Sequence, residues 1–354
     1  MKDLQIQPNQ KVYKFQFIRK LGGGAFGEVW QAYDSFIDKL AAVKVLAGDS
    51  PVDARLFEAK IGSKLKHDNL VNVHYAETLN CNGKDYVFIV MDYLSDGSIA
   101  TKLNSCNFLP LQHTLSYIRN VLCGLEYLHE MNFYHNDIKP QNILIGKSGQ
   151  AVLSDYGITC CSPTGGITSS HGFYKLHAAP ETLDSNIVCV QTDIYQVGLT
   201  MLRLLNGIGY LADKFSALGE SAYNDLVSKG KLISDKDFLP YIPTAVKTVI
   251  KKATAHDATA RYQSALEMRR ALEKLTFPGY WTSDETGKLI GYKGNDQYFY
   301  KEEQLSEHIY NFVAKKRNQK SLRETKVMAF CKNNLTKSEL EKQKNKFIHE
   351  VVEK

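Results

Sequence analysis

Two carboxylates, an amide and a lysine occur close together in the middle of this chain. Residues 134–142 read YHNDIKPQN, which places Asp137, Lys139 and Asn142 within one short stretch, and Asp155 follows in the motif DYG. A carboxylate can accept a proton from a hydroxyl group, and a lysine can offset negative charge that develops in a transition state. An amide oxygen and a second carboxylate are ligands for a hard divalent cation. This set of groups is what transfer of a phosphoryl group to a hydroxyl requires.

A glycine-rich turn lies near the N-terminus, where residues 21–29 read LGGGAFGEV. Glycines at 22, 24 and 27 have no Cβ, so the backbone can lie close over phosphate groups. The same spacing occurs in dinucleotide-binding folds, but there a helix follows the turn. Here strand patterns stand on both sides of the turn. We therefore predict a lid over nucleotide phosphates.

Lys44 lies inside an apolar run, AAVKVL, at 41–46. A lysine in a buried strand needs a partner for its charge. Glu58, nine residues before His67, is the candidate partner on a predicted helix. Such a pair alone is as easily two solvated side chains, but the other motifs favour an ion pair.

In this order and at this spacing, the motifs resemble those of the eukaryotic-type, or Hanks-type, serine/threonine protein kinases. The resemblance covers residues 12 to about 275 and includes the Ala-Pro-Glu motif that ends at Glu181 and the late Arg261 that would pair with it. It implies the two-lobed protein-kinase fold, an α+β architecture with a small antiparallel-sheet N-lobe and a mainly helical C-lobe. Lys139 followed by Pro140 resembles the Ser/Thr-specific class more than the Tyr-specific class.

The resemblance also implies the cofactors and the site. ATP would be bound with Mg²⁺, or with Mn²⁺ in its place, and the γ-phosphoryl group would pass to Ser or Thr hydroxyls of proteins, including the chain itself. Asp137 would orient the hydroxyl, Lys139 would stabilise the transferring group, and Asn142 and Asp155 would bind the metal. Lys44 would contact the phosphates. The implied nucleotide-binding residues are Leu21, Gly22, Gly24, Phe26, Gly27, Val29, Ala42, Lys44, Glu58, Met91, Asp92, Leu94 and Leu144.

Three positions depart from the family pattern. Asn136 stands where the family has the Arg of its His-Arg-Asp motif, and an Asn cannot clamp a phosphate with a charged bidentate contact. We therefore predict activity that does not depend on phosphorylation of the loop between Asp155 and Glu181. Tyr156 replaces the usual Phe, so its hydroxyl needs a partner. Gly62 replaces a bulky apolar residue, which predicts a gap and a loosened helix.

Hydrophobic periodicity divides the chain into two lobes and a tail. Period-two patterns predict strands within 12–48, 71–76 and 86–93, and helical patterns occupy 52–66, 113–130, 192–205, 245–255 and 264–275. The predicted domains are an N-lobe with hinge at 12–94, a C-lobe at 95–276 and an accessory region of mixed strand and helix at 277–354. Within that region we expect one or two hairpins at 280–300, a helix carrying Leu305, Ile309, Phe312 and Val313, and a last helix opened by a capping box at Thr336 and Glu339.

The composition is that of an ordinary globular protein, with 354 residues, 44% hydrophobic and 23% charged. Seven cysteines at irregular positions favour reduced thiols and a cytoplasmic location. The polar N-terminus shows no secretory signal, and no apolar run is long enough for a membrane span.

The net charge of +6 comes mostly from the tail, where 277–354 contains 15 Lys and Arg against 11 Asp and Glu. The basic cluster at 315–326 could bind an acidic partner, but a solvated helix face is favoured and nucleic acid binding is not expected. Two other functions stay open. One is a pseudokinase that binds ATP without chemistry, although Lys44, Glu58, Asp137, Asn142 and Asp155 are all present. The other is a small-molecule phosphotransferase of kinase-like fold, against which the Ala-Pro-Glu motif and Lys139 count.

Overall fold

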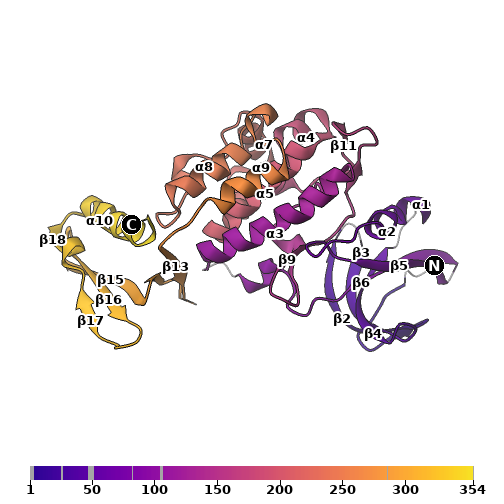
Figure 1. Cartoon of the computed structure of the whole chain (residues 1–354), viewed down its shortest axis with the longest axis horizontal. Helices are drawn as coiled ribbons and strands as arrows, with labels where there is room; N and C mark the ends of the chain where they lie inside the picture. Colours follow the sequence, from indigo (N-terminus) through magenta and orange to yellow (C-terminus); the bar gives the residue numbers. More distant parts are fainter. Residues whose placement is uncertain are drawn as a thin grey trace.

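The computed structural model describes residues 4–24, 27–46, 52–81, 83–103, 107–284 and 286–353. Three parts follow one another along the long axis of the molecule: a sheet-rich N-terminal part, a helical middle and a C-terminal sheet with one helix (Figure 1). The predicted α+β architecture, with a small antiparallel-sheet lobe before a helical lobe, is confirmed.

The N-terminal lobe is a six-stranded antiparallel sheet in the order β1-β2-β3-β4-β6-β5. Its strands are β1 (Lys11–Val12), β2 (Phe15–Gly24), β3 (Gly27–Asp34), β4 (Lys39–Leu46), β5 (Val73–Cys81) and β6 (Lys84–Asp92). One face buries an aromatic core in which Phe15 and Phe88 stack with ring centroids 5.7 Å apart. Because side chains alternate along a strand, Val43 and Val45 join this core while Lys44 points to the opposite face.

Two short helices, α1 (Val52–Arg55) and α2 (Phe57–Gly62), replace the single helix predicted over 52–66. The second helix ends at Gly62, where the backbone N–H of Ser63 still donates to Ala59 O. Glu58 lies in the first turn of α2 and is buried. The helix is therefore shorter than predicted, but it contains the predicted partner of Lys44.

The helical lobe contains α3 (Leu111–Glu130), α4 (Pro180–Ser185), α5 (Val190–Asn206), α6 (Tyr210–Leu218), α7 (Glu220–Ser228), α8 (Thr244–Ala253) and α9 (Ala265–Glu273). The helices predicted near 113–130, 192–205, 245–255 and 264–275 are confirmed as α3, α5, α8 and α9. The apolar stripe of α3, including Ile118, Val121 and Leu125, is fully buried. Helix α5 lies in the interior of the lobe (Figure 1), and almost all of its side chains are buried.

Six very short strands cross the region between α3 and α5 and hold its loops. They are β7 (Phe133–Tyr134), β8 (Ile143–Ile145), β9 (Ala151–Leu153), β10 (Cys160–Cys161), β11 (Thr168–Ser169) and β12 (Ile187–Val188). They pair as β7 with β10, β8 with β9 and β11 with β12. The two stretches that predict the chemistry, at 134–142 and at 155–157, are thereby anchored to the lobe on both sides.

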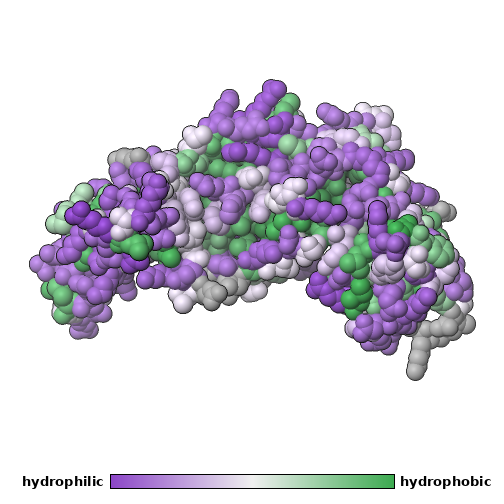
Figure 2. Space-filling view, turned by 60° about the horizontal axis from the view of Figure 1, so that its bottom comes forward, coloured by the Kyte–Doolittle hydropathy of each residue, from purple (hydrophilic) through white to green (hydrophobic). Residues whose placement is uncertain are grey.

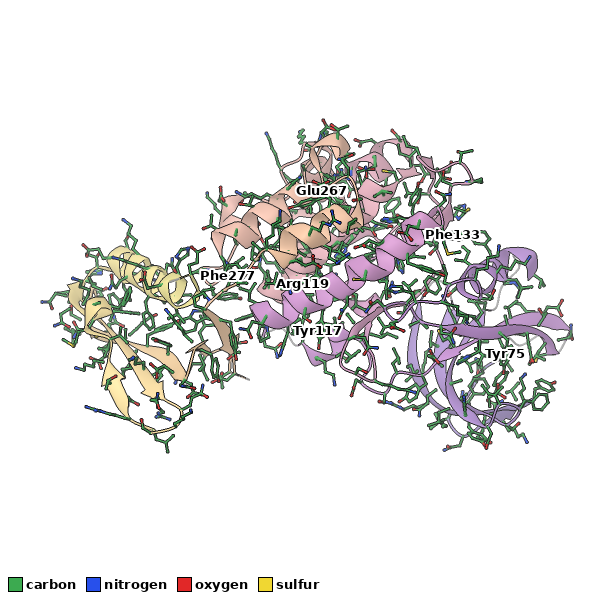
Figure 3. The ribbon with its side chains drawn as sticks, viewed as in Figure 1. Tyr75, Tyr117, Arg119, Phe133, Glu267 and Phe277 are labelled. Atoms are coloured by element: carbon green, nitrogen blue, oxygen red, sulfur yellow. The ribbon has the colours of Figure 1, made fainter. Side chains whose placement is uncertain are left out.

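The C-terminal part is a second antiparallel sheet covered on one face by a helix. It comprises β13 (Gly279–Ser283), β14 (Leu289–Lys293), β15 (Asp296–Ser306), β16 (Ile309–Asn318), β17 (Glu324–Lys326), β18 (Lys332–Leu335) and α10 (Lys337–Glu353). Trp281 is buried beneath α10, and its Nε1–H donates to Ile348 O at 2.8 Å. Phe277 lies where the chain passes from the helical lobe to this sheet (Figure 3).

The predicted hairpins at 280–300 are present as the antiparallel pairs β13–β14 and β14–β15. The capping box that opens α10 is present as well, because Thr336 N donates to Glu339 Oε2 at 2.9 Å. The helix predicted around 305–313 is wrong. Leu305 and Ile309 lie on the two sides of a β-turn between β15 and β16 and are exposed. Their spacing resembles a helical period only because the turn separates two strands.

The basic cluster is also on strands rather than on a helix. Lys315 and Arg317 of β16 both pair with Glu324, and Lys316 pairs with Asp296. Half of the basic side chains that suggested an acidic partner are therefore already neutralised within the sheet.

Most of the visible surface is hydrophilic, with hydrophobic residues in separate patches (Figure 2). Among the residues that the structure describes, no helix combines the length and the hydrophobicity that crossing a membrane requires.

Candidate active site

The face of the first sheet that points toward the helical lobe presents the ammonium group of Lys44. Its Nζ donates to both carboxylate oxygens of Glu58, at 2.9 and 2.7 Å, and to Asp155 Oδ1 at 2.8 Å. Lys44 and Glu58 are buried, whereas Asp155 is partly exposed. The predicted ion pair is present, and it extends to the carboxylate of the DYG motif.

Lys44 and the carboxylates around it shift one another's pKa values. Burial alone would lower the pKa of Lys44, but the carboxylates of Glu58 and Asp155 outweigh it and the pKa lies well above its ordinary value. Burial would raise the pKa of Asp155, but the ammonium of Lys44 holds this pKa below its ordinary value. Asp155 is therefore ionised at neutral pH and suited to bind a cation.

The loop at 134–142 brings its three predicted residues together. Lys139 Nζ donates to both oxygens of Asp137, at 2.8 and 2.7 Å. Asn142 Nδ2 donates to Asp137 Oδ2 at 2.8 Å and to the backbone O of Asp137 at 2.9 Å. Because the amide nitrogen of Asn142 faces Asp137, its amide oxygen remains as the atom that can bind a cation.

Asp193, at the start of α5, holds the loop from below. Its carboxylate accepts hydrogen bonds from the backbone N–H of His135 at 2.9 Å and of Asn136 at 2.8 Å. His135 is fully buried, and burial lowers its pKa, so its ring is neutral. Its Nδ1 accepts from the N–H of Asp137, which leaves Nε2–H to donate to Ser154 O.

The glycine-rich turn connects β2 and β3 as predicted, with Leu21, Gly22 and Gly24 on β2 and Gly27 and Val29 on β3. Phe26 lies outside the described residues. Gly27 has φ +104°, and a Cβ there would lie 2.4 Å from Val45 O. Only a glycine therefore fits this position.

The residues predicted to enclose the adenine lie around the connection between the lobes. Ala42 on β4 is directly opposite Met91 on β6, and Val29 is opposite Lys44. Asp92 ends β6, and Leu94 follows it in the connecting segment. Leu144 on β8 forms a bridge with Ser98 of that segment.

The family model of the protein kinase domain matches residues 15–273. The chain belongs to the protein kinase family.

Curated relatives fall in the same class. This kinase domain is similar to the serine/threonine-protein kinase PrkC of Bacillus subtilis, with 28% identity over 264 residues, which cover 72% of this chain and 39% of the relative. It is similar to a probable serine/threonine-protein kinase PknB of Lactococcus lactis, with 28% identity over 284 residues, covering 75% and 44%. PknJ of Mycobacterium bovis matches at 28% over 276 residues, covering 75% and 46%. The chain therefore matches less than half the length of each of these relatives.

Asn136 in this kinase domain takes part in an uncharged network. Its side chain is fully buried, and Nδ2 donates to Ser170 Oγ at 3.1 Å and to Gly172 O at 2.8 Å. Asn136 has φ +61°, a left-handed conformation that Asn adopts more readily than most residues. The loop between Asp155 and Glu181 is thus attached to the loop at 134–142 by neutral hydrogen bonds.

The gap predicted beside Gly62 is not present. A Cβ at Gly62 would lie 2.4 Å from Val73 Cγ2 and 3.3 Å from the ring of Tyr156, so these two side chains fill the space. The hydroxyl of Tyr156 donates to Val71 O at 2.9 Å, which supplies the partner it was expected to need. Val73 in particular therefore occupies the space that a larger side chain at position 62 would need.

Glu181 and Arg261 form the predicted pair. Arg261 donates through Nη1 and Nη2 to the two oxygens of Glu181, each at 2.8 Å. Burial would raise the pKa of Glu181, but Arg261 lowers it. The pair ties α4 to the segment before α9 and has a structural role.

Sequence reasoning missed two groups near Asp137. The ring of Tyr174 lies 4.5 Å from Lys139 Nζ in a cation–π contact. His177, buried beside it, contacts Ile138 O at 2.7 Å through Nδ1 and Arg203 at 3.1 Å through Nε2. Nothing in the sequence indicated that Tyr174 would contact Lys139.

Proposed function

We propose that this chain is a Mg-ATP-dependent serine/threonine protein kinase that also phosphorylates itself. The observation that carries the proposal is the convergence of two clusters. Lys44, Glu58 and Asp155 are joined by hydrogen bonds no longer than 2.9 Å, and Asp137 and Lys139 are joined by bonds no longer than 2.8 Å. The names of the relatives support the choice of Ser and Thr as acceptors.

Each side chain has a role that follows from its position. Asp137 accepts a hydrogen bond from the substrate hydroxyl and directs the hydroxyl oxygen toward the phosphorus atom. Lys139 offsets the negative charge on the transferring group. Lys44 binds the nonreacting phosphates of ATP and is held in place by Glu58. As the new phosphoester bond forms, the bond between the γ-phosphorus and the oxygen that bridges the β- and γ-phosphates breaks, ADP leaves, and the proton of the hydroxyl passes to Asp137.

The donor set fits a divalent cation bound together with nucleotide phosphates. Among the described residues, no group of three or more His, Cys, Asp or Glu could hold a metal by itself. Asp155 and Asn142 supply one carboxylate and one amide oxygen, and Mg²⁺ is usually held by one or two carboxylates, with substrate phosphates and water completing the shell. When bound, the cation neutralises phosphate charge; Mn²⁺ would serve in the same site.

We also propose that activity does not require phosphorylation of the loop between Asp155 and Glu181. In the family pattern an Arg pairs with a loop phosphate. Here Asn136 already bonds Ser170 and Gly172 without any phosphate. The neutral contacts supply the attachment that a phosphate would otherwise provide.

We propose residues 277–354 as an accessory region attached to the C-lobe. Trp281, Phe312 and Phe347 belong to the same hydrophobic cluster as the core of the helical lobe, and Thr244 N donates to Glu353 Oε1 at 2.7 Å. An acidic partner for its basic cluster has less support than the sequence suggested, because Glu324 and Asp296 already pair with three of the cations.

Incubation of the full chain with labelled ATP and Mg²⁺ tests the proposal. We expect label on the chain, confined to phosphoserine and phosphothreonine, and none without a divalent cation. Asp137→Asn preserves the shape of the side chain and should lower the rate by about 10²- to 10⁴-fold. Equal labelling of the wild type and the Asp137→Asn variant would refute a kinase mechanism.

A further inference from the structure

Gln196 lies on α5, one turn after Asp193, and its side chain is almost completely buried, with 1% of the residue surface exposed. Its Oε1 accepts a hydrogen bond from the backbone N–H of Ile138 at 2.9 Å. Its Nε2 donates to the backbone O of Asn136 at 2.9 Å. These two peptide groups stand immediately before and after Asp137, so one amide side chain bridges the backbone on both sides of that residue.

The orientation of the Gln196 amide follows from its partners. A backbone N–H can only donate and a backbone carbonyl can only accept, so rotating the amide by 180° would set two donors and two acceptors against each other. Both contacts therefore specify one orientation. An apolar side chain of similar shape could make neither of them.

The same amide continues into the activation segment. Gln196 Nε2 also approaches Asn136 Oδ1 at 3.5 Å, and Asn136 Nδ2 donates to Ser170 Oγ and Gly172 O. Each amide N–H group donates to the next segment: Gln196 on α5 donates to Asn136 in the catalytic loop, and Asn136 donates to Ser170 and Gly172 in the activation segment. Asn136 fits this chain because its amide has both an acceptor and a donor, whereas a guanidinium has only donors.

Asp193 and Gln196 hold different sides of Asp137. Asp193 accepts from the N–H groups of His135 and Asn136, which both precede Asp137. On the far side, Gln196 binds the N–H of Ile138, while Thr200 donates to Ile138 O at 3.1 Å. Residues 193, 196 and 200 share one face of α5 because they are three and four residues apart.

We propose that Gln196 is a positioning residue for Asp137, and that it makes the direction of the Asp137 carboxylate depend on α5 rather than on a phosphorylated loop. This inference rests on the proposed kinase function. Gln196 does not contact the reacting atoms. It acts through the backbone of residues 136–138, so its loss should lower turnover without weakening nucleotide binding.

The test compares three variants of the full chain on the same helix. Gln196→Met keeps the length of the side chain but removes both hydrogen bonds. Gln196→Glu can still accept from the Ile138 N–H but places a carboxylate oxygen against Asn136 O. Gln191→Leu is the matched control, because Gln191 is also on α5 and contacts Gln263, remote from the loop.

We expect Gln196→Met and Gln196→Glu to lower kcat by about 10- to 100-fold with the KM for ATP within about twofold of wild type, because a misplacement of about 1 Å can cost this much. Gln191→Leu should change kcat less than about twofold. The assays are run well below the measured melting temperature of each variant. A wild-type kcat in both Gln196 variants, or a loss that follows only the unfolded fraction, overturns the inference.

Amide hydrogen exchange gives a readout that does not depend on activity. We expect the Ile138 N–H to be strongly protected in the wild type and in Gln191→Leu, and at least about tenfold less protected in Gln196→Met while the His135 N–H stays protected by Asp193. Unchanged protection of Ile138 overturns the inference. A wild-type chain that labels no better than Asp137→Asn refutes the proposed function instead, while exchange at Ile138 still decides whether Gln196 holds the loop.

Discussion

The two halves of the site are held together by different kinds of interaction. On the N-lobe side, Lys44 joins Glu58 and Asp155 through charge-assisted hydrogen bonds. On the C-lobe side, the attachment of the activation segment runs through Asn136 and Gln196, two neutral amides. Charged contacts are strong but depend on every partner keeping its ionisation state, whereas buried amides depend on geometry alone.

The difference indicates which changes of charge could alter the activity of this kinase domain in each half of the site. The charged half can be changed by moving a carboxylate, because a displaced Glu58 would leave Lys44 with only Asp155. Among the described residues, the side-chain hydrogen bonds of Asn136 and Gln196, which we call the neutral half, involve no cation that could bind a phosphate. We therefore expect activity to fall when a charge is removed from the half around Lys44. We also expect it to fall when a charge is added to the half around Asn136.

The largest effect is expected from Lys44→Met, which removes the ammonium group and leaves two carboxylates facing each other. We expect kcat/KM to fall by about 10²- to 10³-fold, since a preorganised charge at the phosphates is lost. Steady-state kinetics with ATP and a protein acceptor measures this. Lys39→Met on the same strand is the control, because Lys39 is exposed, and it should stay near wild type. Equal rates for the two variants would show that the N-lobe cluster does not serve the reaction.

An isosteric pair of substitutions tests the contrast itself. Glu58→Gln removes a charge from the charged half, and Asn136→Asp adds one to the neutral half beside the carboxylate of Asp193. We expect each to lower kcat/KM by about 10- to 100-fold, because Glu58→Gln leaves the buried Lys44 with one carboxylate instead of two and Asn136→Asp buries a charge without a partner. Thermal melts of both variants separate this loss from unfolding. If Asn136→Asp keeps wild-type activity, neutrality on the C-lobe side is not required.

How much of the fold and of the site could be predicted from the sequence depends on how far apart in the chain the interacting residues are. The helices at 113–130 and 192–205 were predictable because their period reflects burial along one element. The pairing of Lys44 with Glu58 was predictable because the family pattern places both. By contrast, the packing around Gly62 brings Val73 and Tyr156 together from separate parts of the chain, and only the packed structure shows that Val73 fills the gap.

The error over residues 305–313 has a local cause. Apolar residues on two sides of a β-turn were spaced like those of a helix, although the residues that are buried, Phe312 and Ala314, alternate with a period of two. Gln196 was passed over for a different reason. A lone glutamine in an apolar helix has no signature in sequence, and its role comes from the loop that folds against it.

A smaller effect is expected from the activation segment. Thr164→Ala and Ser169→Ala remove exposed hydroxyls that could be phosphorylated, and each should change kcat less than about threefold because the neutral contacts do not involve them. Ser170 differs, because its hydroxyl is buried and bonds Asn136 and Gly172. Ser170→Ala should lower kcat up to about tenfold, and Ser170→Asp should not restore it. Initial rates of the phosphatase-treated and untreated proteins are compared. A loss of more than tenfold in kcat of the variants at 164 or 169 would show that activity depends on phosphorylation of the loop.

The smallest effect concerns the pH dependence of the free energy of unfolding, to which His177 contributes. Burial and the nearby Arg203 hold the pKa of His177 well below its ordinary value, so the ring stays neutral in the folded chain. In the unfolded chain the ring takes up a proton near its ordinary pKa of about 6.5. The folded state is therefore favoured fully above that pH and loses up to about 1.4 kcal/mol per pH unit as pH falls below it, until the folded pKa is reached.

His177→Gln removes this titration while its amide can still donate to Ile138 O. We expect the free energy of unfolding, measured in urea between pH 7 and pH 5, to fall less steeply in His177→Gln than in the wild type. His177 faces Arg203, Lys139 and Tyr174, so the variant also keeps the cations that surround this position. His113→Gln changes an exposed histidine on α3 and should keep the wild-type slope. Parallel slopes in all three proteins would mean that His177 is not the source of the acid sensitivity of the fold.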